Sequence, residues 1–355
     1  MEFKEKLEIL LDAKYENQAF SGVVLLKRKD EELFKGCYGY ANRSFSVPNT
    51  LQTKFRIASI SKIFTAVSVL KLIEEGKLSL DTSIKQYLDL QDCEISEEVN
   101  IHSLLTHTSG IGDYFDEEND DWDAMWLTSP IYNMRKHSDY YSIFSKKASV
   151  FNTGEKFKYN NAGYILLGMA IEKASGLPYF DYVKKEIFNK QGMNHTDFIS
   201  LEMVYDDVAE GYIPIKSESG ETTGWKRNIY SITPEAAADG GATSTAEDLI
   251  KFLQLLKNGA ILSETMTNKI FEPQVLDQGA NGARGYIWKQ GYANCFILDQ
   301  NEKIVRGGQT GEEYGFSCRL YYYPEKDIDV VILANQDWCA GALGWEIHDT
   351  ILELL

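Results

Sequence analysis

One stretch of this chain is apolar on nearly every side of the helix that it predicts. Residues 63–70, Ile-Phe-Thr-Ala-Val-Ser-Val-Leu, follow a Ser-Ile-Ser-Lys segment at residues 59–62. A helix that is apolar all round belongs inside a protein rather than on its surface. We therefore expect a core that surrounds this helix. A chain of 355 residues is long enough to build that core as one large domain or two intimate ones.

Ser59 and Lys62 stand three residues apart at the start of this helix. Positions i and i+3 share a helix face, so the hydroxyl and the amine can meet. Desolvation beside a buried helix favours the neutral amine, which can accept a proton from a serine nucleophile. The pattern therefore indicates a serine hydrolase whose base is lysine.

The spacing alone is a weak signal, because a chain of this length contains about one Ser-x-x-Lys match by chance. A second match, Ser68 to Lys71, lies in the middle of the same predicted helix. We interpret Ser68 as a packing residue and Lys71 as a solvated surface charge. Ser59 differs because it stands at the helix start, where free backbone N–H groups can meet an oxyanion.

Strand and helix patterns divide the chain into three parts. An amphipathic helix near residues 3–11 and a hairpin of two strands, residues 22–27 and 32–36, come first. Residues 80–235 favour helices and loops, with helices over 102–108 and 162–174. In the last part, Ser244 and Glu247 predict a capping box that opens a helix over 246–257. Five strands and a C-terminal helix follow, at residues 285–289, 295–298, 304–307, 316–323, 329–335 and 345–355.

Early strands, a helical middle and late strands predict an α/β (α+β) fold. The turns between the late strands are short enough for antiparallel neighbours. We expect residues 1–80 and 236–355 to form an antiparallel sheet flanked by helices, and residues 81–235 to form a mostly helical inserted domain. The active site is then expected in the cleft between them. Trp225, Trp288 and Trp345 are expected in the core.

The composition excludes several classes of function. A formal charge of −17 opposes binding to nucleic acid or anionic lipid, both of which need basic patches. No apolar run approaches the ~20 residues of a membrane span, so we expect no membrane insertion. The first residues alternate in charge without an apolar core, which predicts a cytoplasmic protein without a signal peptide. Five cysteines without a C-x-x-C pair indicate free thiols, and five histidines without an H-E-x-x-H motif predict no metal site.

A Tyr-Asn-Asn segment at residues 159–161 lies a hundred residues after Ser59. Alone it is a poor signal, because three other segments match Y-x-N equally well. It belongs, however, to an ordered set of six stretches, at residues 55–62, 103–110, 154–164, 239–249, 308–311 and 314–317. This set resembles the superfamily of class C β-lactamases, DD-peptidases and esterases, the penicillin-binding-protein-like serine hydrolases. The ordered set is far more specific than any of its members.

The resemblance implies a role for each matching residue. Ser59 would be the nucleophile, Lys62 its base, and Tyr159 the proton partner that also activates the hydrolytic water. The backbone N–H groups of Ser59 and Glu312 would form the oxyanion hole, where one donor is typically worth ~3 kcal/mol of transition-state stabilisation. Asn161 would hold the lysine or the substrate amide. No cofactor is implied.

One motif departs from the family pattern. The third motif usually reads Lys-Thr-Gly or His-Thr-Gly, and here it reads Gln309-Thr310-Gly311. We expect these three residues to contact substrate, but the cation that steers a substrate carboxylate is replaced by a neutral amide. Recognition of an anionic β-lactam or peptide C-terminus is therefore less favoured than recognition of an uncharged ester or amide.

Two other features have competing interpretations. Residues 113–123 are acidic with interleaved aromatics, which is typical of a solvated loop. Alternatively they form a lid whose aromatics, with Trp126, Tyr132 and Tyr140, line an acyl site. Its acids would then favour cationic substrates. We interpret His107 as a structural histidine at a helix end, because a lysine already fills the role of base.

These observations predict a serine hydrolase that cleaves small ester or amide bonds through an acyl-serine intermediate. A β-lactam or a D-amino-acid peptide is the nearest variant of that substrate. The alternative is a catalytically silent relative that binds a ligand or partner in the same cleft. Gln309 favours the alternative, whereas Ser59, Lys62 and Tyr159 oppose it. The sequence does not indicate an oligomeric state.

Overall fold

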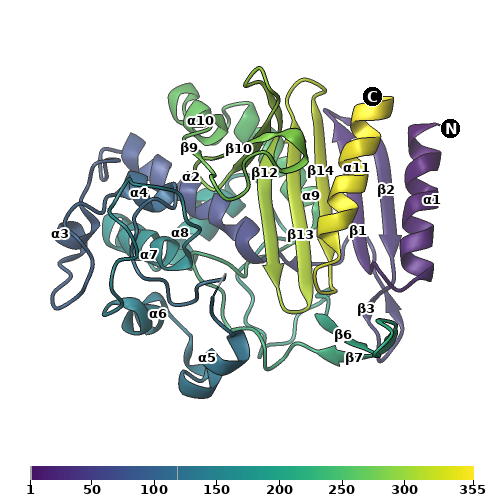
Figure 1. The fold of residues 1–355 in the computed structure, drawn as a ribbon, viewed down its shortest axis with the longest axis horizontal. Coiled ribbons are helices and arrows are strands. Elements are labelled where there is room, and N and C mark those ends of the chain that lie inside the picture. The colour runs from purple at the N-terminus through teal and green to yellow at the C-terminus, as the bar shows by residue number, and fades with distance from the viewer. Residues whose placement is uncertain (1, 118) are drawn as a thin grey trace.

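The computed structural model describes residues 2–117 and 119–355, and all of their side chains except those of residues 122 and 123. Its centre is an eight-stranded sheet in the order β2-β1-β14-β13-β12-β11-β10-β9, with every neighbouring pair antiparallel (Figure 1). The predicted antiparallel α/β fold is therefore confirmed. The strands are β1 (Gly22–Arg28), β2 (Glu31–Tyr38), β9 (Val275–Leu276), β10 (Ile287–Gln290), β11 (Cys295–Leu298), β12 (Ile304–Glu313), β13 (Phe316–Tyr323) and β14 (Ile328–Ala334).

Alternation along the strands sends side chains into two separate cores. Val24 and Ile332, which are paired in register, face a core formed with α1 (Phe3–Glu16) and α11 (Ala340–Leu354). Val23 and Leu333, also paired, face the larger core on the other side, which contains α2 (Lys62–Glu74) and α9 (Ala246–Lys257). In Figure 1, α11 crosses in front of the sheet and α1 lies beside it near β2.

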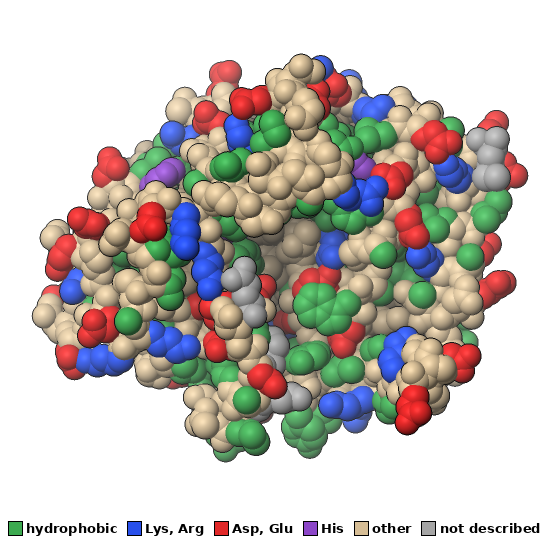
Figure 2. Space-filling view, in the orientation of Figure 1, with side chains coloured by type: hydrophobic (Ala, Val, Ile, Leu, Met, Phe, Trp, Pro, Cys, Tyr) green, Lys and Arg blue, Asp and Glu red, His purple; other side chains and the backbone are tan. Residues whose placement is uncertain are grey.

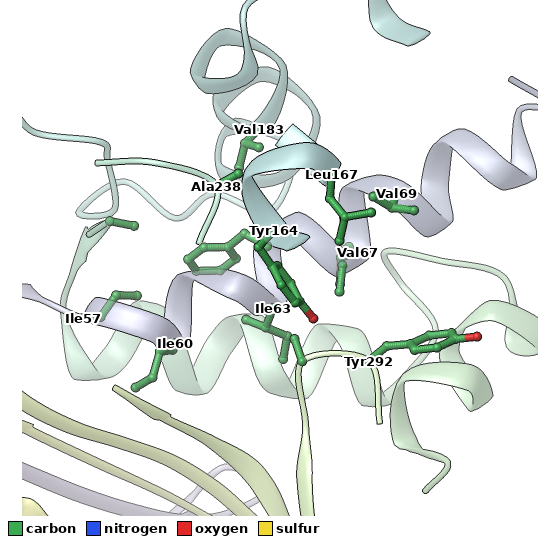
Figure 3. Close-up of a cluster of buried hydrophobic side chains, with 14 of the residues drawn as sticks. Ile57, Ile60, Ile63, Val67, Val69, Tyr164, Leu167, Val183, Ala238 and Tyr292 are labelled. Carbon is green, nitrogen blue, oxygen red and sulfur yellow. The ribbon is translucent and has the colours of Figure 1, made fainter. Parts of the chain in front are cut away.

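The helix α2 joins the sheet to the helical region. Every residue from Lys62 to Leu70 is buried, which confirms the prediction from its all-round apolar sequence. Figure 3 shows Ile63 and Val67 of α2 beside Tyr164 and Leu167 of α7. The helical region comprises α3 (Ile84–Leu88), α4 (Ile101–Leu105), α5 (Trp122–Thr128), α6 (His137–Phe144), α7 (Asn161–Ser175) and α8 (Tyr179–Val183), followed by a π turn (Lys184–Asn189). A one-turn helix (Ile131–Asn133) lies between α5 and α6.

Several predicted boundaries differ from the structure. The strand predicted at 304–307 extends to Glu313, because three glycines lower its apparent strand propensity without preventing pairing with β13. The cap of α9 is Thr245, whose Oγ1 accepts a hydrogen bond from the Asp248 N–H, while Ser244 instead contacts Thr196. The hairpin of β6 (Tyr212–Lys216) and β7 (Thr222–Arg227) was not predicted, because most of its side chains are polar or exposed. The remaining elements are β3 (Tyr40–Asn42), β4 (Val47–Pro48), β5 (Phe55–Arg56), β8 (Thr243–Ser244) and α10 (Glu264–Phe271).

The three tryptophans expected in the core are only partly buried. The Arg43 guanidinium lies 3.6 Å from the ring centroid of Trp225, and that of Arg306 lies 4.3 Å from the ring centroid of Trp345. An indole ring offers a polarisable face as well as apolar area, and here arginines occupy that face. The core prediction was therefore wrong for these residues.

The domain boundaries at residues 80/81 and 235/236 stay a prediction. Residues 81–235 contain α3 to α8 together with the β6–β7 hairpin. No helix in the described parts of the chain combines the length and apolar character needed to cross a bilayer.

Candidate active site

Ser59 lies in a tight turn that leads into α2. A 3₁₀ turn (Ala58–Ser61) precedes the α-helix, so Ser59 stands just before α2 rather than inside it. Ala58 has a φ of +45°, in the left-handed region that residues with a Cβ avoid. Such strain often marks functional segments of a backbone. The turn leaves Ser59 partly exposed and places its Oγ 3.0 Å from the Lys62 Nζ.

The Lys62 amine is buried and surrounded by oxygen atoms. Its Nζ lies 2.8 Å from Asn161 Oδ1 and 2.6 Å from the Asp239 carbonyl, in addition to Ser59 Oγ. Burial lowers the pKa of Lys62, while the charges of Asp239, Glu117 and Asp113 act in the opposite direction. A neutral amine has two N–H donors and one lone pair. The two carbonyl oxygens match the donors, and the Ser59 hydroxyl is the group left to face the lone pair.

Tyr159 lies beside the same amine. The Lys62 Nζ is 4.9 Å from the centroid of the Tyr159 ring, and the Ser59 hydroxyl is within hydrogen-bonding reach of the phenol. Burial raises the pKa of Tyr159 well above its ordinary value; the charge of Glu117 adds to this effect, and the Ser59 hydrogen bond opposes it. The phenol therefore keeps its proton near neutral pH. The structure thus brings together the three side chains that the sequence selected as catalytic candidates.

His107 holds the Tyr159 ring in place. The imidazole stacks between Tyr159 and Tyr164, with centroid separations of 4.5 and 5.1 Å. Its Nδ1 accepts a hydrogen bond from the Asn160 N–H at 3.1 Å. Burial lowers the pKa of His107 to about 3, so the ring is neutral. The interpretation of His107 as a structural histidine agrees with this arrangement.

The start of α7 positions Asn161. The Asn160 side chain caps the helix by accepting from the Gly163 N–H at 2.7 Å. Asp113 accepts from the N–H groups of Asn161 and Ala162, at 2.5 and 2.9 Å. Burial raises the pKa of Asp113 to about 7 even though these hydrogen bonds favour the carboxylate. Asp113 is therefore a partly buried cap, and because Tyr114 and Phe115 beside it are buried, the solvated-loop interpretation of residues 113–123 was wrong at this end.

The strand β12 brings Glu312 to the other side of Ser59. A Cβ on Gly311 would lie 2.2 Å from the Ile57 carbonyl oxygen, so only glycine permits this approach of β12 to the turn before Ser59. A cavity of about 70 Å³ opens there, and both Ser59 and Glu312 line it. Figure 2 shows the hollow on this face, between the helical region on the left and the sheet on the right.

The walls of this cavity, called here the catalytic cavity, come from distant parts of the chain. Of the three aromatics expected around an acyl site, Trp126 and Tyr140 line it, whereas Tyr132 lines a different groove. Asp239 and Tyr114 line it as well, and the Tyr114 hydroxyl donates to the Asp239 carboxylate. The other lining residues are Arg56, Ala58, Glu117, Asn161, Ser231, Ile232, Thr233, Ala237, Gly240, Glu313 and Tyr314.

The charged groups of the catalytic cavity are mostly acidic. Arg56 forms an ion pair with Glu313 at 2.8 Å. Likewise, Arg319 pairs with Glu312 at 2.5 Å, so neither guanidinium is left to bind a substrate anion. Glu117 is exposed, and its Oε1 accepts from the Asn161 Nδ2 at 3.0 Å.

The Gln309-Thr310-Gly311 motif lies on β12 directly before Glu312. The Gln309 side chain is buried, with its Oε1 accepting from the Thr310 N–H at 3.0 Å, and Thr310 is exposed. Of the described residues that line the catalytic cavity, none belongs to 309–311. Contact of these three residues with substrate stays a prediction. Across residues 2–117 and 119–355, no group of three His, Cys, Asp or Glu side chains is arranged to hold a metal ion.

The sequence did not identify four residues that shape this site. Asp239 contributes a carbonyl, Asp113 a helix cap, Tyr114 a hydrogen bond to Asp239, and Glu117 a carboxylate. A backbone carbonyl has no side-chain signature, although Asp239 begins one of the six ordered stretches. Asp113, Tyr114 and Glu117 were noted only as members of an acidic segment. Its residue 118 lies outside the described residues.

Comparison with known proteins agrees with the site and fold. A sequence model of the Beta-lactamase family matches residues 7–338. Penicillin-binding protein 4* of Bacillus subtilis is 27% identical over 348 residues, covering 94% of this chain and 72% of that protein. Esterase EstB of Burkholderia gladioli is 27% identical over 321 residues, covering 83% of this chain and 80% of that protein. The crystal structure of a penicillin-binding protein from Bacillus halodurans is 35% identical, with a TM-score of 0.86, and the match covers 97% of this chain and 100% of that one.

A serine and a buried lysine in contact beside an antiparallel sheet define a serine hydrolase of the penicillin-binding-protein type. The chain belongs to the Beta-lactamase family. Its relatives include an esterase and a β-lactamase, as expected for a family of serine hydrolases.

Proposed function

We propose that this protein hydrolyses small esters or amides, uncharged or cationic, through an acyl-Ser59 intermediate. The observation that carries the proposal is the environment of Lys62, whose two carbonyl partners leave one direction of the amine facing Ser59 Oγ at 3.0 Å. A buried, lowered-pKa amine held this way is suited to act as a general base.

In the acylation step, the neutral Lys62 amine takes the proton of Ser59, and Oγ attacks the substrate carbonyl carbon. The carbonyl oxygen becomes an oxyanion that the backbone N–H groups of Ser59 and Glu312 stabilise. As the tetrahedral intermediate collapses, the bond to the leaving group breaks. That group takes a proton from Tyr159, which recovers one from the Lys62 ammonium.

Deacylation follows the same route with water as the nucleophile. Tyr159 accepts a proton from the water as it passes its own proton to the neutral Lys62 amine, and the oxygen of the water attacks the acyl carbon of the ester on Ser59. The second oxyanion forms at the same backbone N–H groups. Its collapse releases the acid and returns a proton to Ser59 Oγ, which restores the starting state.

The substrate class follows from the charges of the catalytic cavity. Both nearby arginines are paired, residue 309 is a neutral amide, and Glu117 adds a negative charge. An anionic β-lactam or peptide carboxylate therefore finds no unpaired cation among the described residues that line the cavity. An uncharged ester, or an amide bearing an ammonium group, avoids this repulsion. A cytoplasmic location stays a prediction.

Labelling with a fluorophosphonate tests the proposal directly. Intact-mass measurement should show one adduct on the wild type and none on Ser59→Ala. Ser68→Ala is the matched control, since Ser68 is buried in α2 and begins the second Ser-x-x-Lys match. This control should label like the wild type. Absence of both the adduct and p-nitrophenyl acetate turnover in the wild type would support a silent, ligand-binding relative instead.

A further inference from the structure

A second and larger concavity lies next to the catalytic cavity. This lateral groove has a volume of about 530 Å³, within the range of sites that bind small organic ligands. Figure 2 shows hydrophobic side chains gathered below the central hollow. The groove is lined by residues 199–205, 208–211, 227–230, 232 and 234, together with Ile131, Tyr132 and Phe316.

Large apolar side chains stand open to solvent along this groove. Val204 is 97% exposed, Tyr230 83% and Met203 64%. Contiguous exposed apolar surface of this kind usually marks a binding site. We therefore expect a ligand of this groove to have apolar surface of its own.

The charges at the groove are already neutralised. Glu202 receives two hydrogen bonds from the Arg135 guanidinium, at 2.5 and 2.8 Å. Arg227 is 3.1 Å from Glu210. Because these pairs satisfy one another, the groove offers no strong attraction to an ionic head group, and its ligand is apolar and uncharged.

The groove and the catalytic cavity share a wall. Ile232 lines both, and the intervening residues Ser231 and Thr233 line the catalytic cavity. The Asn228 side chain, on the groove side, donates to the carbonyl of Tyr314 at 2.7 Å, and Tyr314 lines the catalytic cavity. Ile232 is therefore the boundary that a flexible chain attached at Ser59 would cross to enter the groove.

The proposed chemistry decides which end of the substrate points this way. The leaving group takes its proton from Tyr159 and must face that phenol. Tyr159 does not line the groove. It lines a separate small pocket together with Gly110, Ile111, Asp113, Asp116, Val150, Phe151, Lys158 and Asn160. The acyl part is bonded to the same carbon and has to lie elsewhere in the catalytic cavity, whose wall includes residues 231–233.

We propose that the lateral groove binds the aliphatic end of a medium-length acyl chain, so that the protein prefers esters or amides of such acids. This inference rests on the proposed function. A second copy of the chain is the competing occupant of an exposed apolar surface. The charge of −17 opposes it, since like-charged copies repel one another.

A series of p-nitrophenyl esters from acetyl to decanoyl, below their micellar concentrations, tests the inference. In the wild type, kcat/KM should rise once the chain is long enough to reach the groove, by up to about fourfold for each further CH₂. The decanoyl-to-acetyl ratio should fall at least tenfold in Tyr230→Glu and in Val204→Glu, because a carboxylate opposes burial of the chain. Phe45→Glu is the matched control, as Phe45 is 82% exposed and lies outside the groove. It should keep the wild-type ratio.

Three results would overturn the inference. A ratio that does not rise with chain length in the wild type excludes an acyl site. A ratio equally affected by Phe45→Glu shows a general effect of added charge. If Tyr230→Glu converts a dimer to a monomer in sedimentation and leaves the ratio unchanged, the groove is a subunit contact. Failure of the wild type to cleave even the acetyl ester would instead refute the proposed hydrolase activity.

Discussion

Replacing Glu117 by glutamine should move the acidic limb of the pH–rate profile to lower pH. The Glu117 charge favours the ammonium form of Lys62 and so raises the pKa of that amine against the opposing effect of burial. Glutamine removes the charge but keeps an amide oxygen for the Asn161 Nδ2. The Lys62 pKa should therefore fall, and the neutral amine that the proposed mechanism requires should persist to lower pH.

The structure sets the size of the shift. Glu117 reaches Lys62 through Asn161, by hydrogen bonds of 3.0 and 2.8 Å at the two ends of one amide. At a charge separation of about 7 Å, the interaction is about 2.4 kcal/mol for an effective dielectric constant of 20 and about 0.6 kcal/mol for that of water. One pKa unit corresponds to about 1.4 kcal/mol. Because the Glu117 side chain is exposed and screened, we expect the lower part of this range, about 0.5 to 1 unit.

The assay is kcat/KM for p-nitrophenyl acetate, which carries no ionisable group, measured from pH 5 to 9 at fixed ionic strength. Glu97→Gln is the control, since Glu97 is exposed and does not line the catalytic cavity. Raising the salt concentration should shrink the difference between wild type and Glu117→Gln. An unchanged limb would show that the titrating base is not coupled to Glu117. A limb displaced to higher pH would refute the sign of the argument, and with it Lys62 as the base.

Three further changes test other parts of the site. Gly311→Ala places a methyl group against the Ile57 carbonyl, and p-nitrophenyl acetate turnover should fall about a hundredfold or more as β12 moves away from the oxyanion. The pKa of Asp113 is raised in the folded protein from an ordinary 3.8 to about 7. Between these two pH values the folded protein therefore binds more protons than the unfolded chain. The free energy of unfolding should accordingly fall as pH rises from 4 to 7. Denaturant titrations at pH 5 and 8 should show a smaller fall in Asp113→Asn, and an equal fall would contradict the assignment. Gln309→Lys should raise the rate of acylation by penicillin about tenfold or more if the missing cation limits binding of the carboxylate, and unchanged rates would exclude that explanation.

Patterns within short stretches of the sequence predicted part of the site. Helical spacing alone indicated that Ser59 and Lys62 meet, and the apolar run after them indicated that Lys62 is buried. The 3.0 Å contact between Ser59 Oγ and Lys62 Nζ agrees with the first expectation, and the burial of Lys62 agrees with the second. Tyr159 was selected only through its place in an ordered set of motifs, because Y-x-N is common in a chain with 21 tyrosines.

The remaining parts depend on contacts between distant segments. The Asp239 carbonyl reaches Lys62 across 177 residues, and no side-chain pattern marks a carbonyl as an acceptor. The acidic segment at 113–123 was interpreted from its charge, yet Asp113 is partly buried because it accepts from the N–H groups at the start of α7. In the same way, the tryptophans were assigned to the core from apolarity alone, whereas arginines occupy the ring faces of Trp225 and Trp345.

The sheet pairs the beginning of the chain with its end. In register, β1 and β14 join Val24 to Ile332, so the second strand-neighbour of β1 is synthesised about three hundred residues after β1 itself. Until it arrives, a growing chain on the ribosome displays β1 as an open edge, and the central sheet is unfinished. A chain that stops before β14 should therefore be inactive and prone to aggregation, so activity depends on a strand made long after the catalytic serine and lysine.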